Sequence, residues 1–152
     1  MKYVIFALQS KKFGIDIHLI HEFSKAPYIS AVLGQSSKVA GLVNLRGRIT
    51  LALDLGCCFD LAPEIKGTKP KTMIVLDSQD NLSDEAKALG VVSHTEPLIL
   101  LIDRIISIVE VEATDFHPVP SQKENDLIDG LIQVDNELIP LLSIPQLINT
   151  LA

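Results

Sequence analysis

The chain contains no tryptophan, and its only aromatic residues are five phenylalanines and two tyrosines. It therefore offers few side chains on which nucleic-acid bases could stack. Positive charge is scarce as well, since 13 Lys and Arg stand against 19 Asp and Glu and leave a net charge of −6 at pH 7. A chain with this balance repels a phosphate backbone. We therefore expect no nucleic-acid partner.

Cysteine is limited to Cys57 and Cys58, which are adjacent in the sequence. Adjacent cysteines cannot join distant parts of the chain, and two of them cannot complete a four-ligand zinc site. We interpret them as buried free thiols. The alternative is a redox-sensing disulfide between neighbours, which requires a strained peptide geometry and a less reducing environment than the cytoplasm.

Long hydrophobic runs are absent too. The longest is the short run 98–102, far below the roughly 20 residues that cross a bilayer, and Met1 leads into a strand-like segment rather than a signal peptide. We expect a cytoplasmic protein without membrane insertion. With 152 residues and 47% hydrophobic content, the chain can bury a sizeable core.

Motifs for catalysis or metal binding are weak. His18 and His21 would share one side of a helix, but the surrounding pattern favours a strand, on which they face apart. Asp54 and Asp103 allow a paired-carboxylate hydrolase to be imagined, yet no glycine-rich phosphate loop, Ser-His-Asp order or Cys-His arrangement accompanies them. We therefore predict no enzyme, no metal site and no cofactor.

The feature around which the chain can be arranged is a hairpin at residues 41–55. Arg46-Gly47 provides a tight turn, because glycine adopts positive φ without strain. The return arm alternates strictly, which predicts Ile49, Leu51, Leu53 and Leu55 on a core face and Arg48, Thr50, Ala52 and Asp54 on the other face.

This hairpin recurs without a gap at residues 130–144, at an offset of 89 since Gly130 minus Gly41 is 89. The apolar positions are kept, but the turn changes from Arg46-Gly47 to Asp135-Asn136. The inverted charge leaves two interpretations of Arg46: a turn residue, or a contact for a partner. The second return strand is apolar on both faces, so Ile139 and Leu141 predict either packing between two barrels or a surface for another protein.

The repeat extends over most of the chain. Residues 3–8 and 13–23 predict a first hairpin, and residues 72–77 and 98–109 repeat it, since Ile102 minus Ile17 is 85. Between them the second copy carries an insertion, residues 78–97, in which Ser83 predicts the N-cap of a two-turn helix and Gly90 its end.

These elements predict a mainly β fold of two similar five-stranded SH3-like barrels packed together, with short helices. We expect one domain over residues 1–152, with a first barrel at roughly 1–62, a second at roughly 71–144 and a C-terminal helix at 145–151. Proline-containing residues 63–71 have the composition of a connector.

The sequence resembles the CheW family of bacterial chemotaxis coupling proteins over nearly its whole length. The most specific match is Asn44-Leu45-Arg46-Gly47 with Asp54-Leu55, supported by residues 13–17, 20–23, 100–104 and 116–120 and by the second hairpin. The resemblance implies an adaptor, without catalytic activity, that links the cytoplasmic tips of chemoreceptors to the regulatory domain of a CheA-type histidine kinase. It also implies that Ile20, Glu22 and Arg46 contribute to receptor coupling.

The sequence departs from the family pattern at three places. Leu51 stands where the family often has proline, Gly56-Cys57-Cys58 replaces a basic residue after Asp-Leu, and the insertion at 78–97 is much longer than the usual hairpin. The alternative function is therefore a divergent CheW-like barrel that binds another partner or a small ligand outside swimming chemotaxis, for example in pilus-based motility.

Overall fold

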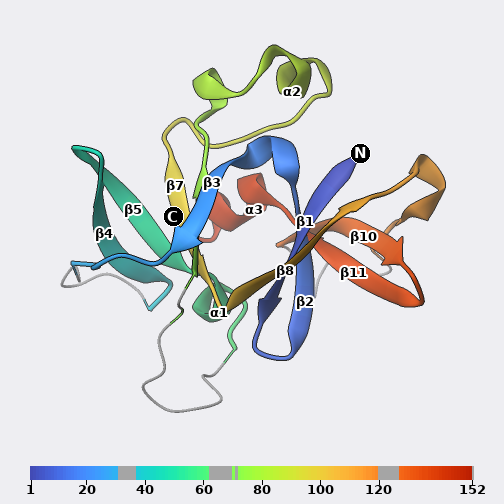
Figure 1. Cartoon of the computed structure of the whole chain (residues 1–152), viewed down its shortest axis with the longest axis horizontal. Coiled ribbons are helices and arrows are strands. Elements are labelled where there is room, and N and C mark those ends of the chain that lie inside the picture. The colour runs from blue at the N-terminus through green and yellow to red at the C-terminus, as the bar shows by residue number, and fades with distance from the viewer. Residues whose placement is uncertain (31–36, 62–69, 71, 120–126, 152) are drawn as a thin grey trace.

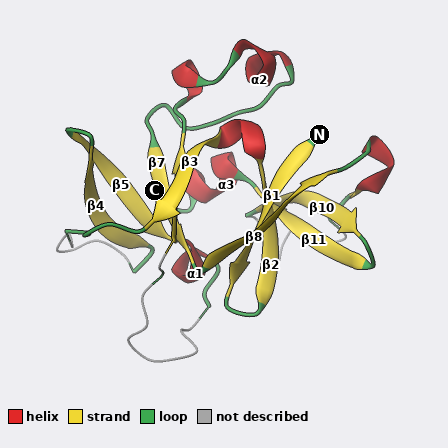
Figure 2. Cartoon of the chain, in the orientation of Figure 1, coloured by secondary structure: helices red, strands yellow, loops and turns green. Residues whose placement is uncertain are grey.

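The structure is a computed structural model that describes residues 1–30, 37–61, 70, 72–119 and 127–151. Its strands form two sheets that lie side by side, each curved into a small barrel (Figure 1). Barrel A has the strand order β8-β1-β2-β11-β10-β9 and barrel B has the order β3-β6-β7-β5-β4. The predicted mainly β fold of two SH3-like barrels with few short helices is confirmed (Figure 2).

The strands of barrel A are β1 (Lys2–Leu8), β2 (Lys11–Asp16), β8 (Arg104–Glu110), the two-residue β9 (Phe116–His117), β10 (Ile128–Val134) and β11 (Glu137–Leu142). Those of barrel B are β3 (Ile20–Lys25), β4 (Val39–Leu45), β5 (Arg48–Asp54), β6 (Thr72–Leu76) and β7 (Leu98–Ile102). Most neighbours are antiparallel, but β11 pairs with β2 and β5 pairs with β7 in parallel.

Barrel A is therefore made from the two ends of the chain, and barrel B from the middle. The expected boundaries, a first barrel at 1–62 and a second at 71–144, are wrong, because β6 and β7 lie between β3 and β5 in one sheet. The chain crosses between barrels at the 3₁₀ turn η1 (Ile17–Leu19) and again at Asp103. These crossings are equivalent in the repeat, so the two copies exchange their opening hairpins.

The first crossing also corrects the strand expected at residues 13–23. Strand β2 ends at Asp16, whose carboxylate accepts a hydrogen bond from the backbone N–H of His18 and caps η1. Asp side chains favour this local capping over continued strand pairing. The chain therefore turns out of barrel A before it enters β3.

Three apolar clusters hold the molecule together, one inside each barrel and one shared between the barrels. Strand β1 serves two of them, with Tyr3 and Ile5 inside barrel A and Val4 and Phe6 in the shared cluster. Strand β7 also contributes to two clusters. Its Ile99 packs inside barrel B, and the adjacent Leu98 and Leu100 pack in the shared cluster. Both faces of these strands are buried, which explains their unbroken apolar sequences.

The predicted hairpins at 41–55 and 130–144 are present as β4–β5 and β10–β11. The expectation of a single core face on β5 is wrong, because Thr50 and Ala52 are buried while Ile49 is 63% exposed. Near the turn, the Ile49 face of the hairpin points away from the barrel. Farther along the strand, Leu53 on that face meets the shared core.

On β11 the two apolar faces have different neighbours. Ile139 and Leu141 pack inside barrel A with Tyr3 and Ile5, so they are covered within their own barrel rather than by barrel B or a partner. Leu142 on the other face reaches the shared core.

The α-helices are short: α1 (Leu55–Cys58), α2 (Asp84–Ala88) and α3 (Ile144–Asn149). Helix α3 corresponds to the helix expected at 145–151 and buries Ile144 and Leu147 in the shared core. The other 3₁₀ turns are η2 (Gln79–Asn81) and η3 (Ala113–Asp115).

Helix α2 confirms the helix predicted within the insertion. The Ser83 hydroxyl oxygen accepts a hydrogen bond from the backbone N–H of Ala86, and Gly90 ends the segment with φ of +79°. The insertion projects from the top of the molecule in Figure 1, beyond β7 and β3.

Candidate functional site

The β4–β5 turn holds Arg46 in an unusual backbone conformation. Arg46 has φ of +53° and Gly47 has φ of +85°, which is the pattern of a type I′ turn. The Asn44 side-chain oxygen accepts a hydrogen bond from the Gly47 N–H at 2.9 Å and fixes the turn. Since the left-handed region is unfavourable for a residue with a Cβ, arginine at this position is not explained by turn propensity.

The structure brings together two of the three residues predicted for the site. The Arg46 Nη2 atom donates a hydrogen bond to the Glu22 Oε2 atom at 2.8 Å, although the residues are 24 positions apart. The Arg46 side chain is 68% exposed and the Glu22 side chain 29% exposed. An ion pair this open to solvent contributes at most about 1 kcal/mol to the free energy of unfolding. We call this pair the Glu22–Arg46 corner.

Ile20, the third predicted residue, is less accessible to a partner because it packs partly against the core. It begins β3 opposite Leu76 and packs, partly buried, against the shared core. A register shift between Ile20 and Glu22 changes the pairing with β6 at this point. Ile20 therefore lies on the same strand as the corner, but part of its side chain belongs to the core.

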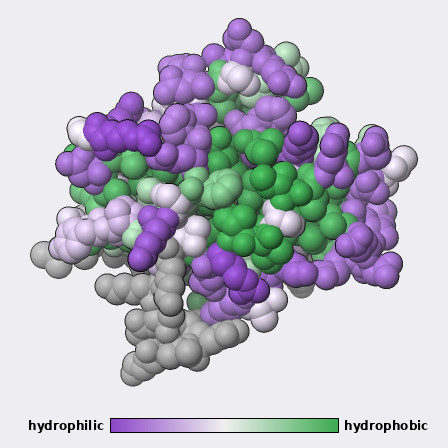
Figure 3. Space-filling view, in the orientation of Figure 1, coloured by the Kyte–Doolittle hydropathy of each residue, from purple (hydrophilic) through white to green (hydrophobic). Residues whose placement is uncertain are grey.

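An apolar surface that sequence analysis missed lies on β8 and β3. Ile106 and Ile108 of β8 are 38% and 52% exposed, and Phe23 of β3 is 43% exposed. We call these three residues the β8 patch. Figure 3 shows hydrophobic side chains gathered over β8 at the centre of the molecule and reaching toward β3, with polar side chains around them. Strand β8 ends its sheet in the strand order, and an edge strand with exposed isoleucines favours contact with another protein.

The sequence carried one signal for this patch. Residues 105–108 read Ile-Ile-Ser-Ile, so Ile106 and Ile108 fall on the same face of a strand on which polar residues would be expected at a surface. Without the sheet order, that face could equally have been assigned to a buried interface.

The histidines and cysteines are used locally. The Nδ1 atom of His18 lies 2.8 Å from Asp16, and that of His21 lies 3.1 Å from Asp77. Across the described ranges, no three or more His, Cys, Asp and Glu residues gather closely enough to hold a metal ion. Burial raises the pKa of the Cys58 thiol to about 12, so it is a poor nucleophile at neutral pH.

Two small barrels with a common core, an exposed ion pair at one turn and an apolar edge strand define a double-barrel β domain whose candidate site is a surface. The chain belongs to the CheW-like domain family, whose family model matches residues 2–152. The fold is also that of a solved structure, the scaffolding protein TtCheW from Thermoanaerobacter tengcongensis. The two chains are 20% identical and align with a TM-score of 0.75 over 93% of this chain and 88% of TtCheW.

Among curated proteins, no sequence matches this chain. Within the described residues, no helix is both long enough and apolar enough to span a membrane.

Proposed function

We propose that this protein is a signalling adaptor that couples the cytoplasmic tip of a chemoreceptor to a CheA-type histidine kinase and carries out no chemistry itself. Membership of the CheW-like family and the likeness to a scaffolding protein support the general role. The observation that carries the receptor contact is the Glu22–Arg46 corner, which joins two residues implied by the family resemblance into one exposed charged site.

The corner has the properties of a recognition site rather than of a structural brace. The Arg46 side chain stays 68% exposed while Glu22 accepts a hydrogen bond from its guanidinium group. Arginine in a partly pre-ordered conformation loses less entropy on binding and can donate several hydrogen bonds to a partner. The fixed turn at Asn44 and Gly47 adds to this order.

The β8 patch supplies the apolar part of the proposed contact. Interfaces combine apolar residues at the centre with charged residues such as arginine that confer specificity. A helical receptor tip with apolar residues beside an acidic group would satisfy both surfaces. The kinase then binds elsewhere on the chain, because an adaptor must hold both partners at once.

Charge reversal at the corner tests this proposal. Arg46→Glu should weaken binding to the isolated receptor tip by about 30-fold, since an arginine at an interface centre can contribute about 2 kcal/mol. Its unfolding free energy should change by less than about 1 kcal/mol. The matched control is Lys12→Glu, which reverses a cation in the exposed Lys12–Glu137 ion pair (3.0 Å) of barrel A and should leave receptor binding unchanged.

A double variant tests whether Arg46 contacts the partner directly or acts only through its ion pair with Glu22. Glu22→Arg with Arg46→Glu keeps opposite charges at the corner but exchanges their positions. If the double variant binds the receptor tip like the wild type, Arg46 acts only through Glu22 and the proposed contact is wrong. Ile20→Asp is a poorer test, because Ile20 packs against the shared core and a carboxylate there would also destabilise the fold.

A further inference from the structure

The strand that carries Glu22 is interrupted directly before this residue. Strand β3 is the edge of its sheet and pairs only with β6 among the described strands. Its register with β6 shifts between Ile20 and Glu22, so His21 is the extra residue of a β-bulge. A strand that is bonded on one side and interrupted at this point needs other contacts to hold its start in place.

Asp77, the residue after β6, supplies two such contacts. Its backbone N–H donates a hydrogen bond to the Leu19 carbonyl oxygen at 2.9 Å, and its Oδ1 atom lies 3.1 Å from the Nδ1 atom of His21. The histidine ring can donate this hydrogen bond in its neutral form as well as when it is protonated. The side chains of His21 and Asp77 are 50% and 22% exposed, so their contact adds little to the free energy of unfolding.

Asp77 is also bonded to the returning arm of the insertion. Its carbonyl oxygen accepts a hydrogen bond from the Ser93 hydroxyl at 2.6 Å. The Ser93 N–H donates to the Gln79 side chain at 2.7 Å, and the Gln79 N–H donates to the His94 carbonyl oxygen at 2.7 Å. We call these four residues the insertion base. Strand β3 and both arms of the insertion are therefore joined at Asp77.

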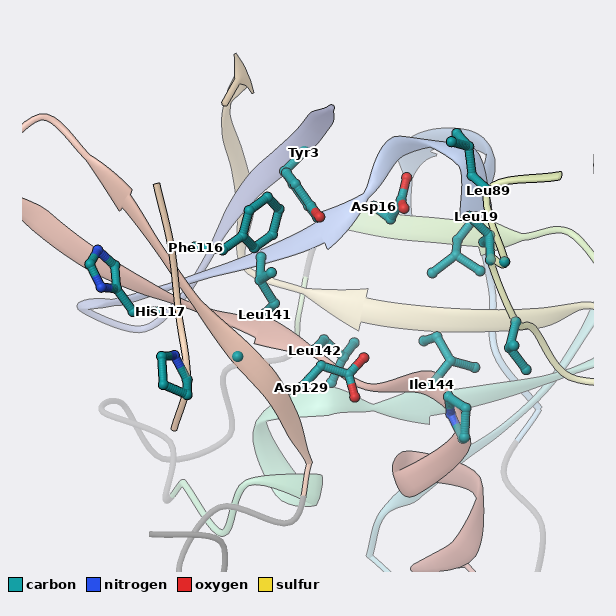
Figure 4. Close-up of a pocket in the computed structure, with 16 residues that line it drawn as sticks. Tyr3, Asp16, Leu19, Leu89, Phe116, His117, Asp129, Leu141, Leu142 and Ile144 are labelled. Atoms are coloured by element: carbon teal, nitrogen blue, oxygen red, sulfur yellow. The ribbon is translucent and has the colours of Figure 1, made fainter. Parts of the chain in front are cut away.

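The outer part of the insertion approaches the same region more loosely. Leu89 lines an open pocket together with Leu19, whose carbonyl oxygen accepts the Asp77 hydrogen bond (Figure 4). Leu89 is 58% exposed, so the walls of this pocket leave much of its side chain uncovered. The hydrogen bonds that join the insertion to the start of β3 therefore lie at the insertion base rather than at α2.

The repeat shows that the bulge does not need the contact with Asp77. In barrel A the register of β8 with β1 also shifts, at Ile106, which is equivalent to His21 because 106 minus 21 is the repeat offset of 85. The two registers align Asp77 with Ala7, which has no side-chain hydrogen-bond acceptor. The contact between His21 and Asp77 is thus an addition in barrel B, on the strand that carries the Glu22–Arg46 corner.

We propose that Asp77 is a positioning residue for the receptor site, which acts through His21 to hold the start of β3 so that Glu22 stays directed at Arg46. The Glu22–Arg46 hydrogen bond of 2.8 Å joins two side chains that solvent reaches, so its population depends on how firmly the β3 backbone is held. The consequence for receptor binding rests on the proposed function, whereas the effect on the corner itself does not.

The side-chain Nε–H signal of Arg46 in NMR spectra of the whole protein reports the corner without a partner. Glu22→Gln marks the position of this signal when the ion pair is lost. Asp77→Ala should move the signal toward that position in a folded protein, since the repeat has alanine at the equivalent place. His21→Ala should do the same, and the double variant should move it no further than either single variant, because both substitutions remove one contact.

Two matched controls leave the contact in place. Asp80→Ala removes an exposed carboxylate three residues farther along the insertion, and removal of residues 83–89 leaves the insertion base intact. Neither change should move the Arg46 signal. An equal movement in Asp80→Ala would show that the signal follows the net charge of the insertion, and would overturn the role of Asp77.

Receptor affinity is measured separately. Asp77→Ala should weaken binding to the receptor tip about fivefold, in the range found for residues that act through a neighbour. An unchanged Arg46 signal in both Asp77→Ala and His21→Ala would overturn the positioning role whatever the receptor affinity. A moved signal with unchanged receptor binding, in Asp77→Ala and in Arg46→Glu alike, would support the positioning role and contradict the proposed receptor contact.

Discussion

Arg46 departs from the backbone preference of its turn, as expected of a residue kept for the proposed receptor contact. The left-handed backbone costs a non-glycine residue about 1 kcal/mol or more, and asparagine would occupy the same turn position with less strain. In the second hairpin the equivalent position is Asp135, also left-handed with φ of +54°. Aspartate therefore occupies the equivalent position in the second turn, whereas the first turn has arginine, which tolerates this backbone conformation less well.

The adjacent cysteines Cys57 and Cys58 have different surroundings. Cys58 is buried in the shared core, while Cys57 is partly exposed and donates its backbone N–H to the Asp54 carboxylate at 3.2 Å. The expected burial is therefore confirmed for Cys58 but is wrong for Cys57, and both cysteines are free thiols. The Asp54 carboxylate caps the start of α1. We expect a reductant to leave the melting temperature unchanged.

The raised pKa of Cys58 predicts a loss of stability in alkali. The unfolded thiol ionises near its usual pKa of 9.0 and the folded thiol near about 12, so the stabilising contribution is full below pH 9 and is lost as the pH rises toward 12. Between pH 8 and pH 10 the wild type should lose about 1 kcal/mol more unfolding free energy than Cys58→Ala. Urea titrations with reductant measure the difference. Equal losses in wild type and Cys58→Ala would contradict it.

At the scale of elements, the insertion is fastened mainly at its base. The Gln79 N–H donates to the His94 carbonyl oxygen at 2.7 Å, and Ser93 donates to the Gln79 side chain and to the Asp77 carbonyl oxygen. Its buried Leu82 and Ala86 are not part of the three barrel clusters. Its partly buried Val91, however, packs against the shared core. The insertion is therefore a small unit at the end of β6 that also reaches the shared core through Val91.

Removal of residues 83–89, with a short Gly-Ser link in their place, should leave a folded protein. Surface insertions closed at their base are tolerated, and lengthening or shortening such a loop changes stability little. We expect cooperative unfolding and unchanged receptor binding. Non-cooperative unfolding of this variant would show that the insertion is part of the core.

Sequence patterns identified most elements but misjudged some of their faces and ends. The two hairpins, their turns and the capped helix at Ser83 follow from local signals such as Arg46-Gly47 and Ser83 with Gly90. The exposed side of Ile49 and the break after Asp16 could not be predicted, because alternation does not reveal where a strand leaves its sheet. The ion pair between Glu22 and Arg46 also depends on tertiary structure.

At the scale of the whole molecule, the exchange of opening hairpins explains why the barrel boundaries were misassigned. Because the two copies carry the same apolar pattern, β1–β2 and β6–β7 could pair within their own copy or with the other one. Sequence similarity cannot distinguish these arrangements. The shared core, filled from both sheets and from α1 and α3, is the consequence that makes the barrels one folding unit.

The exchange predicts that the first half of the chain does not fold alone. A fragment of residues 1–62 contains β3, β4 and β5 but lacks β6 and β7, which separate β3 from β5 in the sheet. We expect no cooperative thermal transition by circular dichroism, and recovery of one when residues 70–152 are added. A fragment 1–62 that unfolds cooperatively by itself would show that each copy can form its own barrel.

In the proposed function, one chain holds a receptor and a kinase at separate surfaces, with the Glu22–Arg46 corner on the receptor side. The most direct measurement is size-exclusion chromatography with light scattering on the chain mixed with its cognate receptor tip and kinase regulatory domain. The wild type should form a three-component complex, and Arg46→Glu should form only the complex with the kinase domain. Retention of the receptor tip by Arg46→Glu, or failure of the wild type to bind either partner, would contradict the proposed coupling of receptor and kinase.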